Sequence, residues 1–335
     1  MTDDAKPNSP EPARSLVVFF GTYDSSAHPR VQVLIDGFNA AGCEVIELNR
    51  SLDFDTASRV KIAQQPWRAS GLLWRIARAW WGLRRDAHSL ADRLGGRTID
   101  LVVVGYLGQF DVHLASHLFD APVALDYMVG MGATTTDRGS RSSVSRALAW
   151  VDRRATTAAD IVLVDTPAQA AVCPSPTAPV VVPVGAPDLW FQDTTDHVSD
   201  GMSVVFFGLY TPLQGASYIG DAISELAGRD DIRFTMIGDG QDRSECEQRA
   251  GSAARRVEWI DWLSRDDLAT EVARHDVCLG IFGTTPKASR VVPNKVYQGA
   301  AAGCAIVTSD TPPQRDVLRD AAVMCPAGDG NAIAG

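Results

Sequence analysis

Short runs of β-branched and aromatic residues alternate with longer stretches of helical periodicity along most of the chain. The first run, residues 16–20, is apolar at every position, which is typical of a strand buried on both faces of a sheet. Strands that alternate with helices indicate βαβ units and parallel sheets, so the pattern predicts an α/β fold. We expect further strands at residues 43–48, 101–104, 123–125, 161–164, 180–184, 204–207, 233–237, 257–260, 277–281 and 305–308.

The alternation is interrupted once, at residues 185–201, by a segment rich in Gly, Pro, Asp and Thr that resembles a linker. We therefore predict two domains, at residues 14–190 and 191–335, each doubly wound and Rossmann-like. Residues 1–13 are polar and rich in Pro, which predicts a disordered tail. The sequence stops where a new helical pattern starts, so a closing helix is expected to be missing.

The composition is that of an ordinary globular protein, with 45% hydrophobic and 21% charged residues. The net charge of −10 argues against general nucleic-acid binding, which depends on cations that neutralise phosphates. The first residues lack the pattern of a secretion signal, and no apolar run reaches the ~20 residues needed to cross a bilayer. Together with six scattered cysteines, this predicts a cytoplasmic protein with reduced thiols.

Residues 278–308 combine the elements of an anion site. Glycines after a strand let the backbone approach a ligand, and Pro293 with Asn294 suits the first positions of a helix, whose N-terminus attracts phosphate. Lys287, Arg290 and Lys295 add three cations around that point. Taken alone, the pattern also fits a solvated loop leading into a core helix.

The run VPNKVYQGAAAGCAIVT within this segment resembles the donor-site helix of family 4 glycosyltransferases of the GT-B fold. Other segments agree in order and spacing: VFFGTY, DRRATTAADIVLVDTPAQ, VVPVGA, FFGLYTPLQG, FTMIGDGQ and IDWLSRDDL. The resemblance covers residues 15–325. It implies two Rossmann-like domains facing across a cleft, a nucleotide-sugar donor on the C-terminal domain, an acceptor on the N-terminal domain, and retention of the anomeric configuration.

The sequence departs from the family pattern at two places in the donor site. Many members carry two glutamates eight positions apart, and these fall here on Arg290 and Gln298; many also place cations where this chain has Leu209 and Gln214. We hypothesise that Lys287, Arg290 and Lys295 bind the donor diphosphate in place of those missing cations. The predicted donor-binding residues are Gly208, Gly215, Gly238, Gly240, Lys287, Arg290, Asn294, Lys295 and Gln298, of which Arg290 and Lys295 are also predicted to be catalytic.

In the N-terminal domain, the residues Gly21, Thr22 and Tyr23 follow the first strand and are predicted to line the acceptor side of the cleft. Asp126 follows a buried strand and is predicted to be catalytic, as a base or by orienting an acceptor hydroxyl. It could equally cap a helix. Two further acceptor-side residues are predicted in a Gly- and Thr-rich loop, Asp137 and Arg138.

The sequence holds no HExxH motif, no clustered metal ligands, and no GxGxxG after the first strand. We therefore predict no metal and no cofactor besides the nucleotide-sugar substrate. Without a metal, cations and helix termini would stabilise the leaving diphosphate.

Between residues 66 and 97, seven arginines accompany only two aspartates. At 100° per residue the arginines gather on one sector, tryptophans spaced seven apart border it, and aliphatic residues cover the other side. Such a helix suits the headgroup layer of an anionic membrane, although it could also be a domain helix with solvated arginines. The predicted membrane contacts are Trp67, Arg75, Arg78, Trp81 and Arg85.

The leading interpretation is a glycosyltransferase that moves a sugar from a nucleotide-sugar donor to a saccharide or lipid-linked acceptor, in surface glycan or glycolipid synthesis. It would act in the cytoplasm, in contact with the inner face of the plasma membrane. A catalytically silent relative that serves as a binding or scaffold subunit stays open because of Arg290 and Gln298. A nucleotide-sugar epimerase on the same fold is the third alternative.

Overall fold

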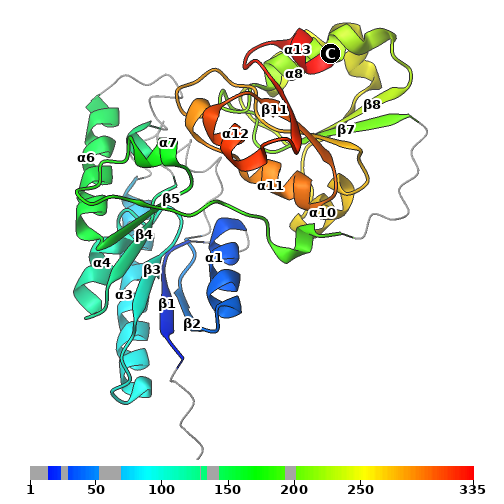
Figure 1. Cartoon of the computed structure of the whole chain (residues 1–335). Helices are drawn as coiled ribbons and strands as arrows, with labels where there is room; N and C mark the ends of the chain where they lie inside the picture. Colours follow the sequence, from blue (N-terminus) through cyan, green and yellow to red (C-terminus); the bar gives the residue numbers. More distant parts are fainter. Residues whose placement is uncertain (1–13, 24–28, 53–68, 129, 134–142, 193–200) are drawn as a thin grey trace, which may run out of the picture.

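A computed structural model shows two α/β domains, each built on a six-stranded parallel sheet (Figure 1). The structure describes residues 14–23, 29–52, 69–128, 130–133, 143–192 and 201–335. The α/β architecture with two domains, predicted from the alternation of strands and helices, is confirmed.

The N-terminal sheet has the strand order β2-β1-β3-β4-β5-β6, so β1 lies between the strands that follow it in the chain. This order reverses direction beside β1, as in doubly wound sheets. The strands are β1 (Leu16–Gly21), β2 (Glu44–Asn49), β3 (Leu101–Val104), β4 (Val123–Asp126), β5 (Ile161–Val164) and β6 (Val180–Val181). The helices are α1 (Pro29–Ala40), α3 (Ala69–Leu94), α4 (Asp111–Leu118), α6 (Ser143–Ala158) and α7 (Pro167–Ala170).

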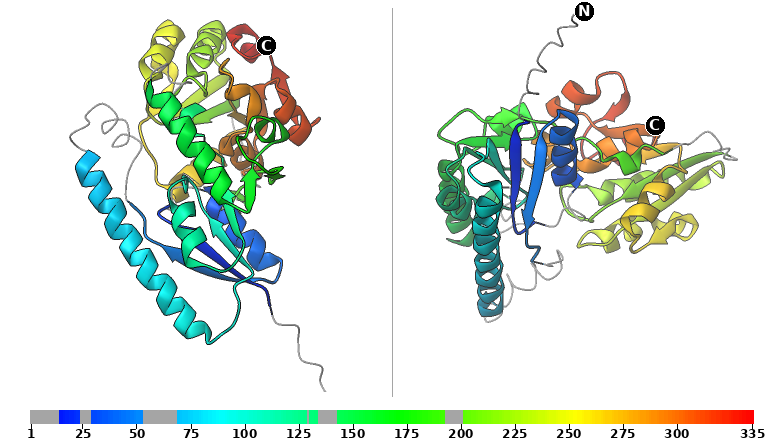
Figure 2. Two further views of the ribbon diagram at one scale, coloured as in Figure 1. Left: turned by 90° about the vertical axis from the view of Figure 1, so that its left-hand side faces the viewer. Right: turned by 90° about the horizontal axis from the view of Figure 1, so that it is seen from below.

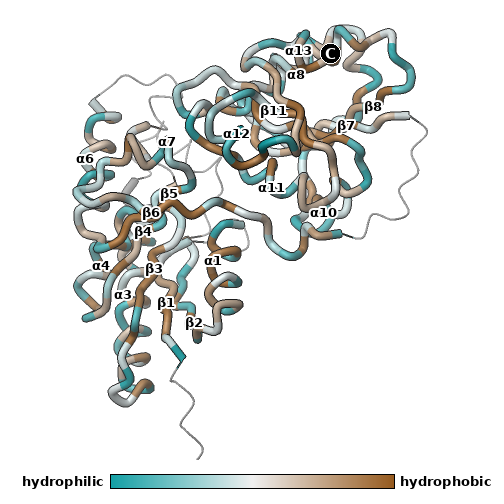
Figure 3. The backbone as a smooth tube through the Cα atoms, in the orientation of Figure 1, coloured by the Kyte–Doolittle hydropathy of each residue, from teal (hydrophilic) through white to brown (hydrophobic). Residues whose placement is uncertain are grey.

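Strand β1 is buried at every position because helices cover both faces of its sheet. Val18 and Phe20 pack in the core that α3, α4 and α6 close, whereas Val17 and Phe19 pack in the core that α1 closes. Successive side chains of a strand point to opposite faces, so a strand in this setting must be apolar throughout. Figure 3 shows the resulting hydrophobic strands at the centre of the domain.

The C-terminal sheet has the order β12-β11-β10-β7-β8-β9. Sequence patterns predicted five of its strands but missed β12. The strands are β7 (Met202–Phe207), β8 (Ile232–Ile237), β9 (Glu258–Ile260), β10 (Val277–Leu279), β11 (Ala305–Ser309) and β12 (Ala322–Cys325). The helices are α8 (Ala216–Glu225), α9 (Arg243–Ala250), α10 (Arg265–Val272), α11 (Asn294–Ala301), α12 (Pro312–Leu318) and α13 (Gly330–Ala334), with 3₁₀ turns η3 (Leu226–Gly228), η4 (Gly251–Arg256) and η5 (Ala288–Arg290).

The connection between the sheets packs on the C-terminal domain. Its 3₁₀ turn η2 (Asp188–Trp190) carries Trp190, which is 1% exposed and stacks on Phe207 with the ring centroids 5.4 Å apart. Trp190 lies on the N-terminal side of the boundary that we predicted at residue 190, yet its partners belong to the second core. A single aromatic side chain therefore anchors the linker to the second domain.

Candidate functional site

The loops at the carboxyl edge of the C-terminal sheet approach one another so closely that glycine is required. Gly238 follows β8 with φ of 118°, and a Cβ there would collide with the carbonyl of Gly208, which follows β7. Gly215 precedes α8 with φ of 67°, and a Cβ there would collide with the backbone of Gly283, which follows β10. Three loops thus form one continuous backbone surface where open α/β sheets bind ligands.

Lys295 brings a buried cation to this surface. The residue is 4% exposed, and its Nζ lies 3.6 Å from the centroid of the Phe206 ring. Its amino end also faces the turn at Gly208, 3.5 Å from the position that a Cβ on this glycine would occupy. Within the described part of the chain, Nζ has no hydrogen-bond partner, and burial lowers the pKa of Lys295 to about 7. The amino group of Lys295 therefore lies next to the loops, titrates near neutral pH, and has no anion beside it among the described residues.

The local sequence explains how the cation is placed. Pro293 is extended, with φ of −73° and ψ of 156°, and helix α11 begins at the next residue. Lys295 and Gln298 are three positions apart, so they share the buried side of α11 with Val296. Asn294, at the helix start, is half-buried. Because α11 packs on the sheet with this side, Lys295 lies under the turn at Gly208.

The other two cations of the predicted group lie where the domains meet. The backbone carbonyl of Arg290 accepts a hydrogen bond from Thr166 Oγ1 of the N-terminal domain at 2.5 Å. Lys287 is close enough to Asp165 to lower the pKa of this carboxyl group, but burial outweighs that effect and raises the pKa to about 6. The carboxyl edges of both sheets therefore contact each other at these residues. That Lys287, Arg290 and Lys295 bind one diphosphate together stays a prediction.

Asp126, at the end of β4, is buried in an ion pair. Its Oδ1 lies 2.7 Å from Nε of Arg30, and the two side chains are 0% and 2% exposed. Arg30 Nη1 also donates to the backbone carbonyls of Val182 and Pro183, at 2.8 and 3.1 Å. The carboxylate is held in this buried ion pair between β4 and α1, and a catalytic role for Asp126 stays a prediction.

The loop after β1 is fixed in a similar way. The backbone N–H and Oγ1 of Thr22 both donate to Asp111 Oδ2 at 2.8 Å, while Trp80 Nε1 donates to Asp111 Oδ1 at 2.7 Å. Asp111 is 3% exposed, and burial raises its pKa. Together with Gly21, whose backbone lies against Asp111, Thr22 is thus held by the domain itself.

Tyr23 was predicted on the acceptor side of the cleft, but the structure places it in the core. It is 3% exposed, and its ring lies against Gly105, where a Cβ would leave it too little room. Burial and the nearby Glu47 raise the pKa of its hydroxyl. The prediction failed because the side chain packs over Gly105, which follows β3, and is covered there. Asp137 and Arg138 lie outside the described residues.

Four polar residues of this region were missed in the sequence, namely Arg30, Asp111, Asp165 and Thr166. Only Thr166 carries a local signal, because a Thr followed by Pro is typical of a helix start. In the structure its Oγ1 accepts from the backbone N–H of Gln169 and so caps α7. The other three are recognisable only from partners far along the chain.

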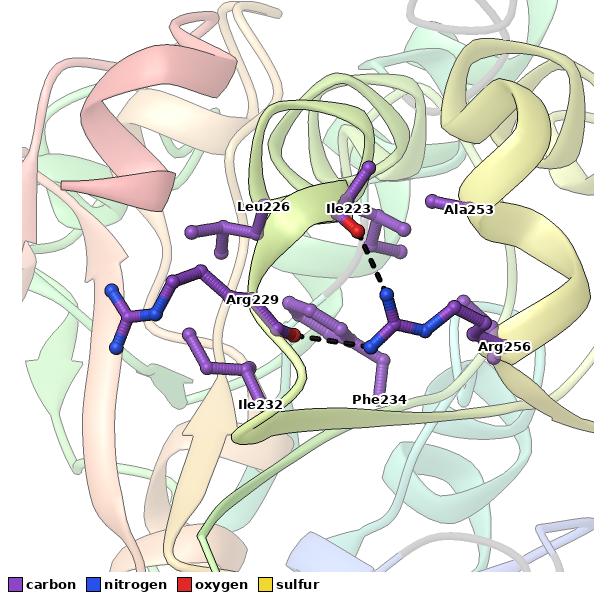
Figure 4. Close-up of a pocket in the computed structure, with 9 residues that line it drawn as sticks. Ile223, Leu226, Arg229, Ile232, Phe234, Ala253 and Arg256 are labelled. Atoms are coloured by element: carbon purple, nitrogen blue, oxygen red, sulfur yellow. Dashed lines mark hydrogen bonds between the residues drawn. The ribbon is translucent and has the colours of Figure 1, made fainter.

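A small pocket elsewhere in the C-terminal domain is not part of this edge (Figure 4). Its volume of about 20 Å³ is enough for roughly one water molecule. Arg256 crosses it and donates to the carbonyls of Ala227 and Arg229, at 2.7 and 3.2 Å. This pocket cannot hold a sugar nucleotide. Among the described residues, no three His, Cys, Asp or Glu side chains come together as metal ligands.

The C-terminal domain, which holds the buried lysine and the glycine-rich loops, has a recognisable family pattern. Residues 201–335 match the model of the family described as glycosyl transferases group 1. The match covers the whole of the second sheet and includes Lys295 and Gln298. No curated protein matches the chain by sequence.

Solved structures extend the likeness to both domains. The sucrose-phosphate synthase of Thermosynechococcus elongatus is 14% identical, with 96% of this chain and 88% of that chain covered, at a TM-score of 0.62. HepE of Anabaena, in complex with UDP and glucose, is 13% identical, with 96% of this chain and 88% of that chain covered, at a TM-score of 0.63. A UDP-forming trehalose-phosphate synthase from Burkholderia vietnamiensis is 13% identical, with 96% of this chain and 88% of that chain covered, at a TM-score of 0.62. The two domains thus have the GT-B fold.

Proposed function

We propose that this protein is a glycosyltransferase that takes a sugar from a nucleotide-sugar donor bound mainly to its C-terminal domain. The observation that carries the proposal is the buried amino group of Lys295, which has no hydrogen-bond partner among the described residues and lies at the carboxyl edge of the domain that matches the family model. A buried charge without a partner is unfavourable, and the phosphates of a nucleotide sugar would supply one. The UDP bound to the structurally similar HepE supports a nucleotide ligand for this fold.

In the proposed reaction, Lys295 donates hydrogen bonds to the donor diphosphate and neutralises the charge that develops as the sugar leaves. The backbone N–H groups near Gly208 and Gly215 would face the same phosphates. Gln298 retains a hydrogen-bond acceptor for a ribose hydroxyl, and Arg290 would contact phosphate. The acceptor hydroxyl attacks from the face that the diphosphate leaves, so the configuration is retained, without a metal ion.

The acceptor is proposed to be a saccharide or a lipid-linked saccharide bound by the N-terminal domain, and the activity to be hexosyl transfer in the synthesis of polysaccharide or glycolipid at the cytoplasmic face of the membrane. The proposal does not assign the base to Asp126, whose carboxylate is paired with Arg30. The base for the acceptor hydroxyl is therefore left to the leaving diphosphate itself.

Donor binding tests the proposal directly. Thermal-shift and calorimetric titrations with UDP-, GDP-, ADP- and CMP-sugars should identify one base that stabilises the protein. Lys295→Met should then weaken the binding of that donor by roughly 10- to 150-fold, the value of a hydrogen bond to a charged group of about 1.5–3 kcal/mol. Arg229→Ala is a matched control, because Arg229 pairs with Asp231 on the exposed surface.

The outcomes also separate the alternatives. Release of nucleotide together with a glycosylated acceptor identifies a transferase, an altered sugar on an intact nucleotide identifies an epimerase, and binding without turnover identifies a scaffold subunit. Unchanged donor affinity in both Lys295→Met and Arg290→Ala would refute the proposed site.

A further inference from the structure

Three helices form a single layer on one face of the N-terminal sheet. Leu83 of α3, Ala115 of α4 and Ala155 of α6 pack in the same core with the strands, and α4 contacts both of the other helices. Figure 2 shows α3 as a long helix on the outer side of the sheet. The sides of α3 and α6 turned away from this core therefore belong to one outer surface.

Tryptophans stand on this outer surface instead of packing beneath it. Trp74 and Trp81 of α3 are 62% and 67% exposed, and Trp150 of α6 is 62% exposed. At 100° per residue, Trp74 and Trp81 lie opposite the buried stripe formed by Leu83 and Leu90. Exposed large aromatic residues of this kind indicate an interaction surface.

Each of the three tryptophans carries an arginine four residues later, stacked over its ring. The guanidinium carbons of Arg78, Arg85 and Arg154 lie 5.6, 5.7 and 5.7 Å from the ring centroids of their tryptophans. This i,i+4 pair occurs twice on α3 and once on α6, so two separate helices present the same chemical unit. We call the surface formed by Trp74, Arg78, Trp81, Arg85, Trp150 and Arg154 the Trp–Arg face.

The Trp–Arg face is basic in an acidic protein. Helices α3 and α6 contain eight arginines and three aspartates, whereas the whole chain has a net charge of −10. Two of the aspartates are engaged within the domain: Asp152 accepts from the backbone N–H groups of Met131 and Gly132, and Asp86 pairs with Arg50 at 2.6 Å. The surface therefore attracts a negatively charged partner.

We propose that the Trp–Arg face binds the surface of a membrane rich in anionic lipids, with α6 as a second contact beside α3. Tryptophan rings are stable at the level of the headgroups, where one edge is apolar and the other wet, and arginines bind the lipid phosphates. In the described residues no helix is long and apolar enough to span a bilayer, so the contact lies in the plane of the interface.

The structure changes the residue list expected from the sequence. Arg78, Trp81 and Arg85 belong to the Trp–Arg face, but Arg75 turns to the side of α3, where its Nη2 donates to the carbonyl of Leu52 at 2.7 Å. Trp67 lies outside the described residues. The pair Trp150 and Arg154 was missed because only the more basic helix was considered.

Flotation of the full-length protein with vesicles tests the proposal. Phosphatidylcholine vesicles that contain phosphatidylglycerol should bind the protein at low salt, and pure phosphatidylcholine should not. Each arginine near the surface contributes about fivefold to partitioning, so Arg78→Ala with Arg85→Ala should weaken binding by about 25-fold. Trp150→Ala with Arg154→Ala should weaken it by at least about fivefold.

The matched control is Trp262→Ala with Arg229→Ala, which removes an exposed tryptophan and an exposed arginine from the C-terminal domain and should leave vesicle binding unchanged. Unfolding midpoints equal to that of the unmodified protein would show that the variants are folded. Brominated acyl chains should quench tryptophan fluorescence, and this quenching should disappear in Trp74→Ala/Trp81→Ala/Trp150→Ala.

Absence of binding to anionic vesicles, or equal binding to neutral vesicles, would overturn the proposal. Unchanged binding in the Trp150/Arg154 variant would overturn the part assigned to α6. Preferential binding to heparin or DNA over vesicles would show that the face binds polyanions in general and not a lipid surface.

Discussion

Two buried charged groups at the carboxyl edges of the two sheets have opposite environments. Asp126 ends β4 in the N-terminal domain and is neutralised by Arg30 at 2.7 Å. Lys295 lies beneath the Gly208 turn in the C-terminal domain, over an aromatic ring and without a hydrogen-bond partner among the described residues. Both side chains are removed from water, but in the described part of the chain only Asp126 has a counter-charge in contact with it.

We interpret the paired charge as structural and propose the other as part of the donor site. A buried ion pair loses several kcal/mol when one partner is removed, so Asp126 and Arg30 hold β4, α1 and the segment after β6 together. An unpaired buried ammonium costs free energy in the folded state, and such groups are concentrated at ligand sites. Sequence reasoning had assigned a catalytic role to both residues, and burial with pairing distinguishes them.

The largest effect is expected on breaking the N-terminal pair. Asp126→Ala removes the carboxylate that pairs with buried Arg30 and leaves only the more distant Asp165 near the guanidinium, so it should lower the free energy of unfolding by about 3–5 kcal/mol, measured by urea denaturation. If Asp126 were a catalytic base instead, the variant would lose activity and keep its stability.

The matched double variant sharpens this result. Arg30→Met together with Asp126→Leu removes both members of the pair, so it should recover most of the lost stability, because neither is left buried without the other. A double variant as unstable as Asp126→Ala would show that the pair is not the cause.

A smaller loss is expected at the loop after β1. Trp80→Phe removes the N–H that donates to Asp111 Oδ1 and should cost about 1.5–3 kcal/mol of stability at neutral pH. Burial raises the pKa of Asp111 in the folded state, so the folded state binds this proton more tightly than the unfolded state. The loss should therefore shrink as the pH falls through that pKa, since a protonated carboxyl needs the donor less.

Urea unfolding of Trp80→Phe at several pH values checks this, with Trp150→Phe as the control because Trp150 is exposed. A pH-independent loss would mean that the ring, and not its hydrogen bond to Asp111, is what stabilises the loop.

The smallest effect has the opposite sign. Lys295→Met removes a buried charge that has no hydrogen-bond partner among the described residues, and it should stabilise the ligand-free protein by about 1 kcal/mol while donor binding is weakened. The pKa of Lys295 is lowered to about 7 from 10.5, so the unfolded state binds the proton more tightly. The stability lost through the buried charge is therefore greatest below pH 7 and declines as the pH rises toward 10.5. The stability that Lys295→Met gains should decline over the same pH range.

Thermal or urea unfolding across this pH range measures the effect. Lys287→Met is the control: Lys287 is half-buried beside Asp165, so its loss should bring no such gain. Destabilisation by Lys295→Met at pH 6 would show that the ammonium has a partner and would break the contrast with Asp126.

The sequence by itself determined the architecture. Strands apolar at every position, such as residues 16–20, require helices on both faces, and that requirement produces a doubly wound sheet. It also determined where the donor-side loops lie, since Gly215 and Gly238 adopt backbone conformations that other residues rarely reach. The run from Pro293 to Gln298 fixed the start of α11.

Only the tertiary structure decided which charges are paired. Asp126 meets Arg30, 96 positions away, and Asp111 meets Thr22, 89 positions away, whereas no described residue supplies an anion for Lys295. Trp150 likewise joins Trp81 on one surface because α6 and α3 cover the same sheet. Periodicity and motifs report on neighbours along the chain, but the cost of a buried charge depends on partners that folding brings from elsewhere.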